Sequence, residues 1–255
     1  MKTLKNTLLV TAILIMSQNL ITAQNSDVQM YAVHEDRVKP SMSKESDRID
    51  KELIDLLKKH NIQEANWITV QKNDHTRLYL SPINSMADLD KNMYATLSEK
   101  IGKDAMSKLF AQYAKCYDEH GDYVINLRKD LSYMPNGMTQ TTEGQPYRRF
   151  YYNYVTAENV NNMTQVFKKI KEVFVKHNAG LHYRIYTPGF GTIGNYFMVV
   201  ISAKNEEELA KAEGVMWEKM SADMQPLFDE LDKYSSKLDM QTGWMRDDLS
   251  YSPKK

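Results

Sequence analysis

The chain has 255 residues, with 33 Lys and Arg against 33 Asp and Glu, six His and one Cys. Balanced charge argues against a general nucleic-acid-binding protein, which would carry a basic excess. A hydrophobic fraction of 42% supplies enough apolar surface for a core and excludes global disorder. Because Cys116 is the single cysteine, the sequence excludes an intrachain disulfide and any cysteine-based metal motif.

The first 23 residues are predicted to be a cleaved secretory signal. Lys2 and Lys5 precede an uncharged apolar run from Leu8 to Met16, and 21–23 (ITA) offers a cleavage site. This run is too short to span a bilayer as a helix, and no Cys follows it for lipid attachment. We therefore expect an exported protein, periplasmic or extracellular, without a stable membrane span.

The sequence contains an internal repeat. Residues 127–135 (LRKDLSYMP) recur as 245–253 (MRDDLSYSP), with six identities in nine at an offset of 118. The tripeptide KHN at 59–61 recurs at 176–178, and LF at 109–110 recurs at 227–228. A period this long is typical of two small domains rather than of a solenoid. The predicted organisation is repeat 1 over 24–135, a polar linker over 136–146 and repeat 2 over 147–255.

The elements of repeat 1 follow from hydrophobic spacing and from helix caps. A first strand begins near Val28, and a helix runs from Ser41 or Ser43 to Lys59. The remaining elements are strands over 67–71 and 78–80, helices over 85–101 and 104–119 separated by Gly102, and a strand over 123–127.

Repeat 2 gives the same order of elements. A strand over 149–155 precedes a helix over 158–176, in which apolar residues recur at spacings of three and four. Strands over 181–186 and 196–201 follow, joined by a turn rich in Pro and Gly. Asn205 is expected to cap a helix that continues to about Lys237 with an interruption near Pro226, and the last strand covers 241–247.

This order, strand–helix–strand–strand–helix–strand, is that of a ferredoxin-like unit, an antiparallel sheet with helices on one face. Two such units in tandem make the chain resemble the dimeric α+β barrel superfamily, which includes antibiotic-biosynthesis-type monooxygenases and stress-responsive barrel proteins. The resemblance implies an α+β fold in which both repeats form an intramolecular pseudo-dimeric barrel. It also implies a space between the two sheets that can hold a small ligand.

The alternation of side chains along strands selects the candidate pocket residues. Aligning Trp67 with His182 places Ile68, Val70, Tyr183 and Ile185 toward the helices, and Thr69, Gln71, Arg184 and Tyr186 toward the second sheet. Aromatic walls with a few polar groups are typical of small-molecule sites, although the same side chains could instead fill the space and bond one another. The candidate ligand-binding residues are Tyr152, Tyr154, His182, Arg184, Tyr186, Trp244 and Arg246.

Other motifs favour structural interpretations. The repeated Arg128 and Arg246 could hold an anion, but pairing with a nearby acid at the end of a strand is the favoured reading. Residues 34–36 (HED) are read as exposed residues after the first strand that point apart, so no metal site is predicted. The glycine pattern at 189–194 joins two strands and is interpreted as a hairpin loop, not a dinucleotide site.

The sequence predicts an exported, non-catalytic protein that binds a small aromatic or anionic ligand between two sheets. The alternative is a monooxygenase-like or haem-handling enzyme of the same fold, in which His182 acts as base or axial ligand. A structural or protein-interaction role is a third possibility, with no apolar surface stripe to favour it. No cofactor is expected except haem under the alternative, and neither catalytic residues nor an oligomeric state can be assigned.

Overall fold

The computed structural model describes residues 27–254, so the predicted signal over 1–23 lies outside the described part of the chain. The described residues form eight strands and five α-helices. The strands are β1 (Val28–Val38), β2 (Ile68–Lys72), β3 (Thr76–Ile83), β4 (Tyr117–Arg128), β5 (Tyr147–Val155), β6 (Tyr183–Pro188), β7 (Asn195–Ala203) and β8 (Ser235–Met245). The helices are α2 (Ser43–His60), α3 (Ala95–Ile101), α4 (Lys103–Ala111), α5 (Val160–Lys176) and α6 (Glu206–Tyr234).

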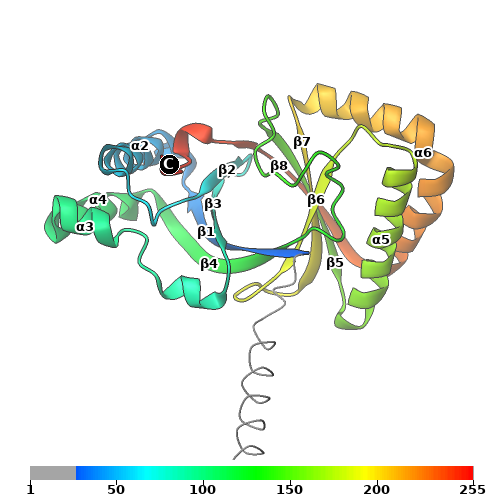
Figure 1. Ribbon diagram of the computed structural model, residues 1–255, viewed down its shortest axis with the longest axis horizontal. Coiled ribbons are helices and arrows are strands. Elements are labelled where there is room, and N and C mark those ends of the chain that lie inside the picture. The colour runs from blue at the N-terminus through cyan, green and yellow to red at the C-terminus, as the bar shows by residue number, and fades with distance from the viewer. Residues whose placement is uncertain (1–26, 255) are drawn as a thin grey trace, which may run out of the picture.

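The strands form one closed antiparallel barrel in the order β1-β3-β2-β8-β5-β7-β6-β4. Helices α2, α3 and α4 lie on one side of the barrel, and α5 and α6 lie on the opposite side (Figure 1). The predicted α+β class is therefore confirmed, with all eight strands in one closed antiparallel barrel. Closing the barrel leaves no sheet edge unpaired.

Two seams join the strands that precede residue 136 to those that follow it. Strand β2 pairs with β8, with Val70 opposite Met245. Strand β4 pairs with β6, with Leu127 opposite Tyr186. Each seam is short, so additional contacts at the strand ends are expected to secure it.

The repeated sequence supplies those contacts. Ser132 Oγ accepts a hydrogen bond from Ile185 N at 2.9 Å, and Tyr133 forms a β-bridge with Tyr183. At the other seam, Ser250 Oγ accepts from Thr69 N at 2.9 Å, and the bridge joins Tyr251 to Trp67.

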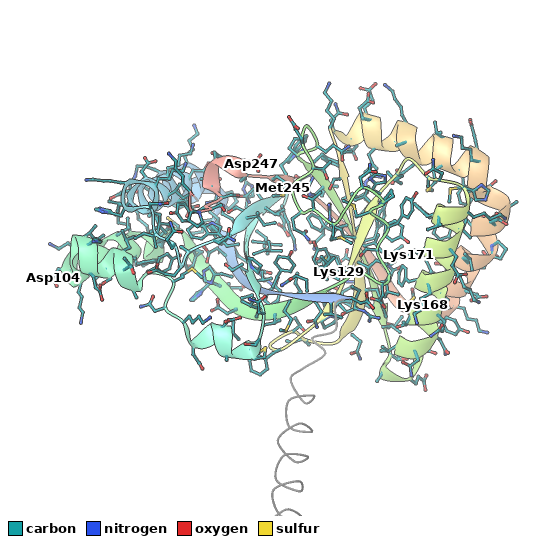
Figure 2. All side chains as sticks on the ribbon, viewed as in Figure 1. Asp104, Lys129, Lys168, Lys171, Met245 and Asp247 are labelled. Carbon is teal, nitrogen blue, oxygen red and sulfur yellow. The ribbon has the colours of Figure 1, made fainter. Side chains whose placement is uncertain are left out.

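The two repeated arginines bond the acid two residues later. Arg128 donates to both oxygens of Asp130 at 2.8 and 2.6 Å, and Arg246 donates to both oxygens of Asp248 at 2.8 and 2.9 Å. This geometry agrees with the structural interpretation of the motif. Beside it, Lys171 of α5 donates to the Lys129 carbonyl at 3.0 Å, which ties the segment after β4 to the helix layer (Figure 2).

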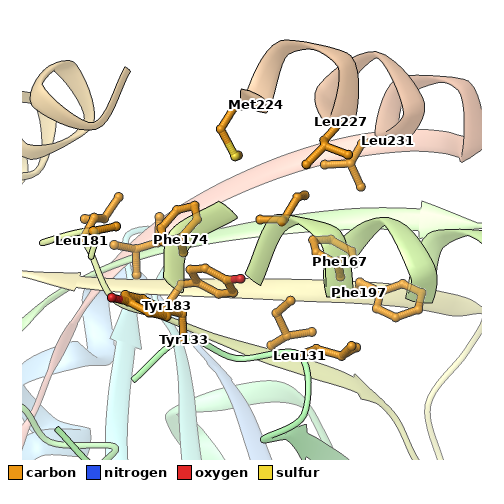
Figure 3. Close-up of a cluster of buried hydrophobic side chains, with 14 of the residues drawn as sticks. Leu131, Tyr133, Phe167, Phe174, Leu181, Tyr183, Phe197, Met224, Leu227 and Leu231 are labelled. Carbon is orange, nitrogen blue, oxygen red and sulfur yellow. The ribbon is translucent and has the colours of Figure 1, made fainter. Parts of the chain in front are cut away.

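A hydrophobic core lies between α5, α6 and the outer face of β6 and β7 (Figure 3). The buried face of α5 carries Met163, Phe167, Ile170 and Phe174, the spacing of three and four that the sequence predicts. The Phe167 and Phe197 rings are 5.2 Å apart, which joins helix to sheet. A second core packs α2, α3 and α4 against the opposite side of the barrel.

Several element boundaries differ from the sequence prediction. The helix predicted over 85–101 is divided into a 3-10 helix over Met86–Asp90 and α3, which begins only at Ala95. Strand β4 begins at Tyr117, in the region predicted as helix to 119, because its polar first half pairs with β1. Helix α6 continues through Pro226, where the buried side chains of Met224 and Leu227 on either side hold it in place. Strand β8 consequently begins at Ser235 rather than 241.

Gly243 allows β2 and β8 to approach closely at the first seam. A Cβ at this position would lie 2.6 Å from the Gln71 carbonyl oxygen, which is backbone and cannot swing away. Gly243→Ala should therefore destabilise the protein by about 1–3 kcal/mol. The matched control is Gly121→Ala in β4, where nothing lies within 4 Å, and equal denaturant midpoints for the two variants would contradict the prediction.

Candidate functional site

The barrel encloses a cavity of about 210 Å³. Its wall is mainly aromatic and aliphatic, with charged side chains at both ends. The polar and aromatic lining residues are Glu35, Lys72, Tyr123, Gln140, Arg148, Phe150, Tyr152, Tyr154, Arg184, Tyr186, Tyr196 and Gln241. Four of the seven candidates predicted from the sequence are among them: Tyr152, Tyr154, Arg184 and Tyr186.

The other three candidates lie outside the barrel. His182 precedes β6, and its ring packs 5.7 Å from Tyr133. The Trp244 side chain is 39% exposed and packs 5.1 Å from the Tyr147 ring. Arg246 is held by Asp248 and by Asp47, whose Oδ2 is 2.7 Å away. The prediction that these three residues line the pocket was wrong. His182 lies just before β6 begins, and in β8 the odd-numbered residues Gln241 and Met245 point into the barrel, so the even-numbered Trp244 points outward. Arg246 lies beyond the end of β8.

The predicted orientation of β2 is reversed. Ile68 and Val70 line the barrel cavity, whereas Thr69 and Gln71 alternate with them and face the helices. Trp67 corresponds to Tyr183, because Trp67 forms a β-bridge with Tyr251 and Tyr183 forms one with Tyr133, the equivalent tyrosine of the repeated sequence. An alignment with His182 is therefore one residue out of register, which exchanges the two faces of β2.

Two buried arginines form one end of the cavity. Arg148 and Arg184 are each 2% exposed, and no carboxylate of the described residues lies within ion-pair distance of either guanidinium. Arg148 donates to the Gln140 and Tyr147 carbonyls at 2.8 and 2.9 Å, and Arg184 donates to the Thr139 carbonyl at 2.8 Å. Burial and the neighbouring charge of Arg184 lower the pKa of Arg148 to about 9. Two desolvated cations with neutral partners favour an anion between them.

The segment over 136–146, predicted as a linker, covers this end of the barrel. The Gln140 side chain accepts a hydrogen bond from the Tyr186 hydroxyl and donates to the Tyr31 hydroxyl at 3.2 Å. Its carbonyl, with that of Thr139, accepts from the two arginines. The segment therefore positions the arginines in addition to connecting β4 to β5.

Lys72 and Glu35 lie at the other end of the cavity, among tyrosines. Lys72 is 8% exposed, and its Nζ donates to the Tyr152 hydroxyl at 3.2 Å. Burial lowers the pKa of the Lys72 ammonium, with a smaller opposing effect from the charge of Glu35. Glu35 in turn accepts from the Tyr123 hydroxyl at 2.8 Å. A buried amine of lowered pKa beside aromatic rings can act as a proton acceptor.

Sequence reasoning missed Lys72, Glu35 and Arg148. Every second residue of β5 points into the barrel, and Arg148 precedes Phe150, Tyr152 and Tyr154 in this series. The predicted strand begins at residue 149, so it does not include Arg148. Lys72 follows Val70 in the same way once β2 has the correct register.

A second, larger cavity of about 620 Å³ lies between the outer face of β1, β3 and β4 and the helices of that side. Its aromatic lining residues are Trp67, Tyr79, Tyr94, Phe110, Tyr113, Tyr117, Tyr123 and Phe190. His34 and Asp36 also line it, although the sequence placed them beyond the first strand; both belong to β1, and being two residues apart they share a face. Burial lowers the pKa of His34, but the nearby carboxylates of Asp36 and Asp122 outweigh it and raise the pKa to about 9.

Comparisons with solved structures identify the fold. The chain is similar to a candidate monooxygenase from Lactobacillus acidophilus NCFM (TM-score 0.53, 11% identity, 88% of this chain and 96% of that one). It is also similar to an anthrone oxidase-like protein (TM-score 0.56, 9% identity, 88% and 94% covered). A candidate monooxygenase from Fusobacterium nucleatum gives a TM-score of 0.53 at 9% identity, with 90% and 100% covered. The chain has the dimeric α+β barrel fold, which confirms the resemblance predicted from the sequence.

Neither the protein-family models nor the curated protein sequences give a match to this chain. The predicted non-catalytic ligand-binding function is contradicted by the structural neighbours, whose descriptions name monooxygenases and an oxidase-like protein. They favour the monooxygenase part of the alternative prediction, which is a monooxygenase-like or haem-handling enzyme. Within residues 27–254, no helix has the length and apolar character needed to cross a membrane.

Proposed function

We propose that the protein is an oxygenase or oxidase that binds a small aromatic substrate, carrying an anionic or enolisable oxygen, inside the barrel. The observation that carries the proposal is the cavity itself. Its aromatic walls separate two buried arginines, which have no acidic partner among residues 27–254, from a buried lysine of lowered pKa. The oxygen of the substrate would lie against Arg148 and Arg184. Its ring would stack among the tyrosines at the far end.

The chemistry assigned to the barrel is proton abstraction followed by oxidation with molecular oxygen. The neutral amine of Lys72 takes a proton from the substrate, and the resulting carbanion or enolate has its charge delocalised onto the oxygen held by the arginines. The electron-rich anion then adds to dioxygen, which is the oxidant. The peroxide formed takes back the proton held by Lys72 and loses water, so that one oxygen atom stays on the substrate as a carbonyl and the other leaves as water. The descriptions of the neighbours as monooxygenases and as an oxidase-like protein support this class of reaction.

Haem is a poorer match to the described residues. The barrel cavity contains no histidine among its lining residues, and its volume of about 210 Å³ suits a small aromatic molecule rather than a porphyrin. His182 reaches neither cavity.

The experiment is an oxygen-electrode screen of the mature protein with small phenols, quinols and their neutral ethers. We expect uptake with anionic or enolisable members and a loss of affinity of about tenfold or more for them in Arg184→Met, since one charge-assisted hydrogen bond is worth about 1.5–3 kcal/mol. Arg48→Met, on the exposed face of α2, is the control. Binding of neutral ethers as tightly as of the anions, or no uptake with any compound, would contradict the proposal.

The barrel is further proposed to be an intramolecular pseudo-dimer of two ferredoxin-like repeats, with boundaries at 24–135 and 147–255. The order of strands supports this, because the two sides of the barrel, read in the same direction, are β4-β1-β3-β2 and β8-β5-β7-β6, which are equivalent when the repeats are superposed. The repeated seam contacts at Tyr133 and Tyr251 support it independently.

Export is also a proposal, and it rests on the signal predicted over 1–23. Mass spectrometry of the protein purified from its host would give a mature N-terminus near residue 24. An intact N-terminal Met would contradict it.

A further inference from the structure

Four polar side chains face each other across β1 and β4, on the side of the barrel that faces the helices. His34 pairs with Asp122 and Asp36 pairs with His120 in the register of the two strands. Side chains of directly paired residues point to the same face, as do residues two apart along one strand. The four groups therefore form a compact square, in which the His34 and His120 rings are 5.7 Å apart.

We propose that His34, Asp36 and His120 bind a divalent transition-metal ion. One ligand atom from each of the three lies within 4.8 Å of the others. His34 Nε2 and Asp36 Oδ1 are 3.1 Å apart, which suits two neighbouring ligands of one ion with bonds of about 2.0–2.2 Å. His120 is exposed, and its ring lies beside those of His34 and Tyr117, with centroids 5.7 and 5.3 Å away.

A second observation that supports a metal ion is that the Asp36 carboxylate is buried with one oxygen left without a hydrogen bond from any described residue. Asp36 is 3% exposed, and its Oδ1 has no hydrogen-bond partner among residues 27–254. The 3.1 Å separation from His34 Nε2 is within ion-pair range but lacks hydrogen-bond geometry, so it does not satisfy that oxygen. Buried carboxylate oxygens are otherwise bonded, and one that faces two imidazoles is arranged as a metal ligand.

Asp122 is not proposed as a ligand, but it orients the imidazole ring of His34. Its Oδ1 lies 2.8 Å from His34 Nδ1, so it can accept that N–H and direct Nε2 toward Asp36. A carboxylate on the second nitrogen is the usual partner of a metal-binding histidine.

The site borders the larger cavity, because His34, Asp36 and Asp122 all line its wall. Two histidines and one carboxylate leave coordination positions open, the pattern of non-haem iron sites, and nitrogen ligands favour Fe²⁺, Co²⁺ or Zn²⁺ over Mg²⁺ or Ca²⁺. The open positions would face a space of about 620 Å³ lined by aromatic rings such as Tyr79 and Tyr117. The metal site is therefore separate from the barrel interior and independent of the function proposed for it.

The test is titration of the metal-free full chain with Zn²⁺ by calorimetry and with Co²⁺ by visible absorption. We expect about one ion per chain and a Co²⁺ spectrum of imidazole and carboxylate ligation. Asp36→Asn, which keeps the shape of the side chain, should weaken binding by more than about 100-fold, and Asp122→Asn by about 10–100-fold. His120→Ala changes an exposed residue and should also weaken binding without loss of fold, which thermal unfolding in the absence of metal checks.

The control is His177→Gln, because His177 contacts a carboxylate, Asp223, at 2.7 Å on the opposite helix layer without a third ligand. It should leave Zn²⁺ affinity and stoichiometry unchanged. Wild-type affinity in folded Asp36→Asn and His120→Ala proteins would overturn the proposal, as would the absence of any Zn²⁺ or Co²⁺ binding to the wild type.

Discussion

Replacing Lys72 by Met should lower kcat/KM for oxygen-dependent turnover of an aromatic substrate by about 10²–10⁴-fold, the usual contribution of a positioned general base. The Lys72 amine is the buried base of the barrel cavity, and the Tyr152 hydroxyl holds it at 3.2 Å. Because burial lowers its pKa, the neutral amine is available at lower pH than for an exposed lysine. The rate of the wild type should therefore rise with pH, with a midpoint below the usual lysine range.

Lys72→Arg separates the role of the base from that of the charge. Arginine keeps the cation but does not deprotonate, so this variant should be as slow as Lys72→Met if proton abstraction is the role. Lys108→Met, on the exposed face of α4, is the control. Recovery of the rate in Lys72→Arg, or an unchanged pH profile in Lys72→Met, would contradict the assignment. The Lys72 pKa can also be measured directly, without a substrate, by NMR of the ¹³C-methylated protein.

The overall fold could be predicted because it depends on features that a sequence carries locally. The amphipathic spacing in α5 and the alternation in β5 each define an element by its own residues. The repeated segment around Tyr133 and Tyr251 then relates the two halves, and it proves to fasten the seams of the barrel. When the same order of strands and helices occurs twice, few arrangements can cover the apolar faces of all the strands, and a closed barrel is one of them.

The candidate site was predicted only in part because side-chain direction depends on register. A shift of one residue moves every side chain of a strand to its other face. In β2 and β8, polar and apolar residues occur on both faces, so alternation alone could not fix the direction. Trp244 was therefore placed inside where Met245 lies, and Lys72 was overlooked.

The proposed metal ligands could not be predicted from the sequence for a related reason. Polar residues around His120 resemble the solvated end of a helix, and only pairing with β1 makes them a strand. His34 and Asp36 then share a face with His120 through contacts between residues about 86 positions apart, which no local pattern reports.

The largest effect on stability is expected from Asp50 on α2. Its carboxylate accepts hydrogen bonds from the guanidinium of Arg77, from the Tyr79 hydroxyl at 2.9 Å and from the Tyr113 hydroxyl at 2.7 Å. Arg77 is 0% exposed, so removing the acid leaves a buried cation with weaker compensation and two unbonded hydroxyls. Asp50→Ala should lower the free energy of unfolding by about 3–5 kcal/mol.

Asp55→Ala is the matched control, since it removes the same side chain from an exposed position on the same helix and should change stability by about 0.5 kcal/mol or less. Urea unfolding of both variants gives the comparison. The loss of stability comes mainly from the buried Arg77 guanidinium that has lost its buried acidic partner. The double variant Asp50→Leu with Arg77→Met should therefore lose less free energy of unfolding than the sum of the losses in the two single variants. Additive effects would show that Asp50 and Arg77 do not act as a pair, and that the remaining partner of Arg77, Asp47 at 25% exposure, compensates the charge unaided.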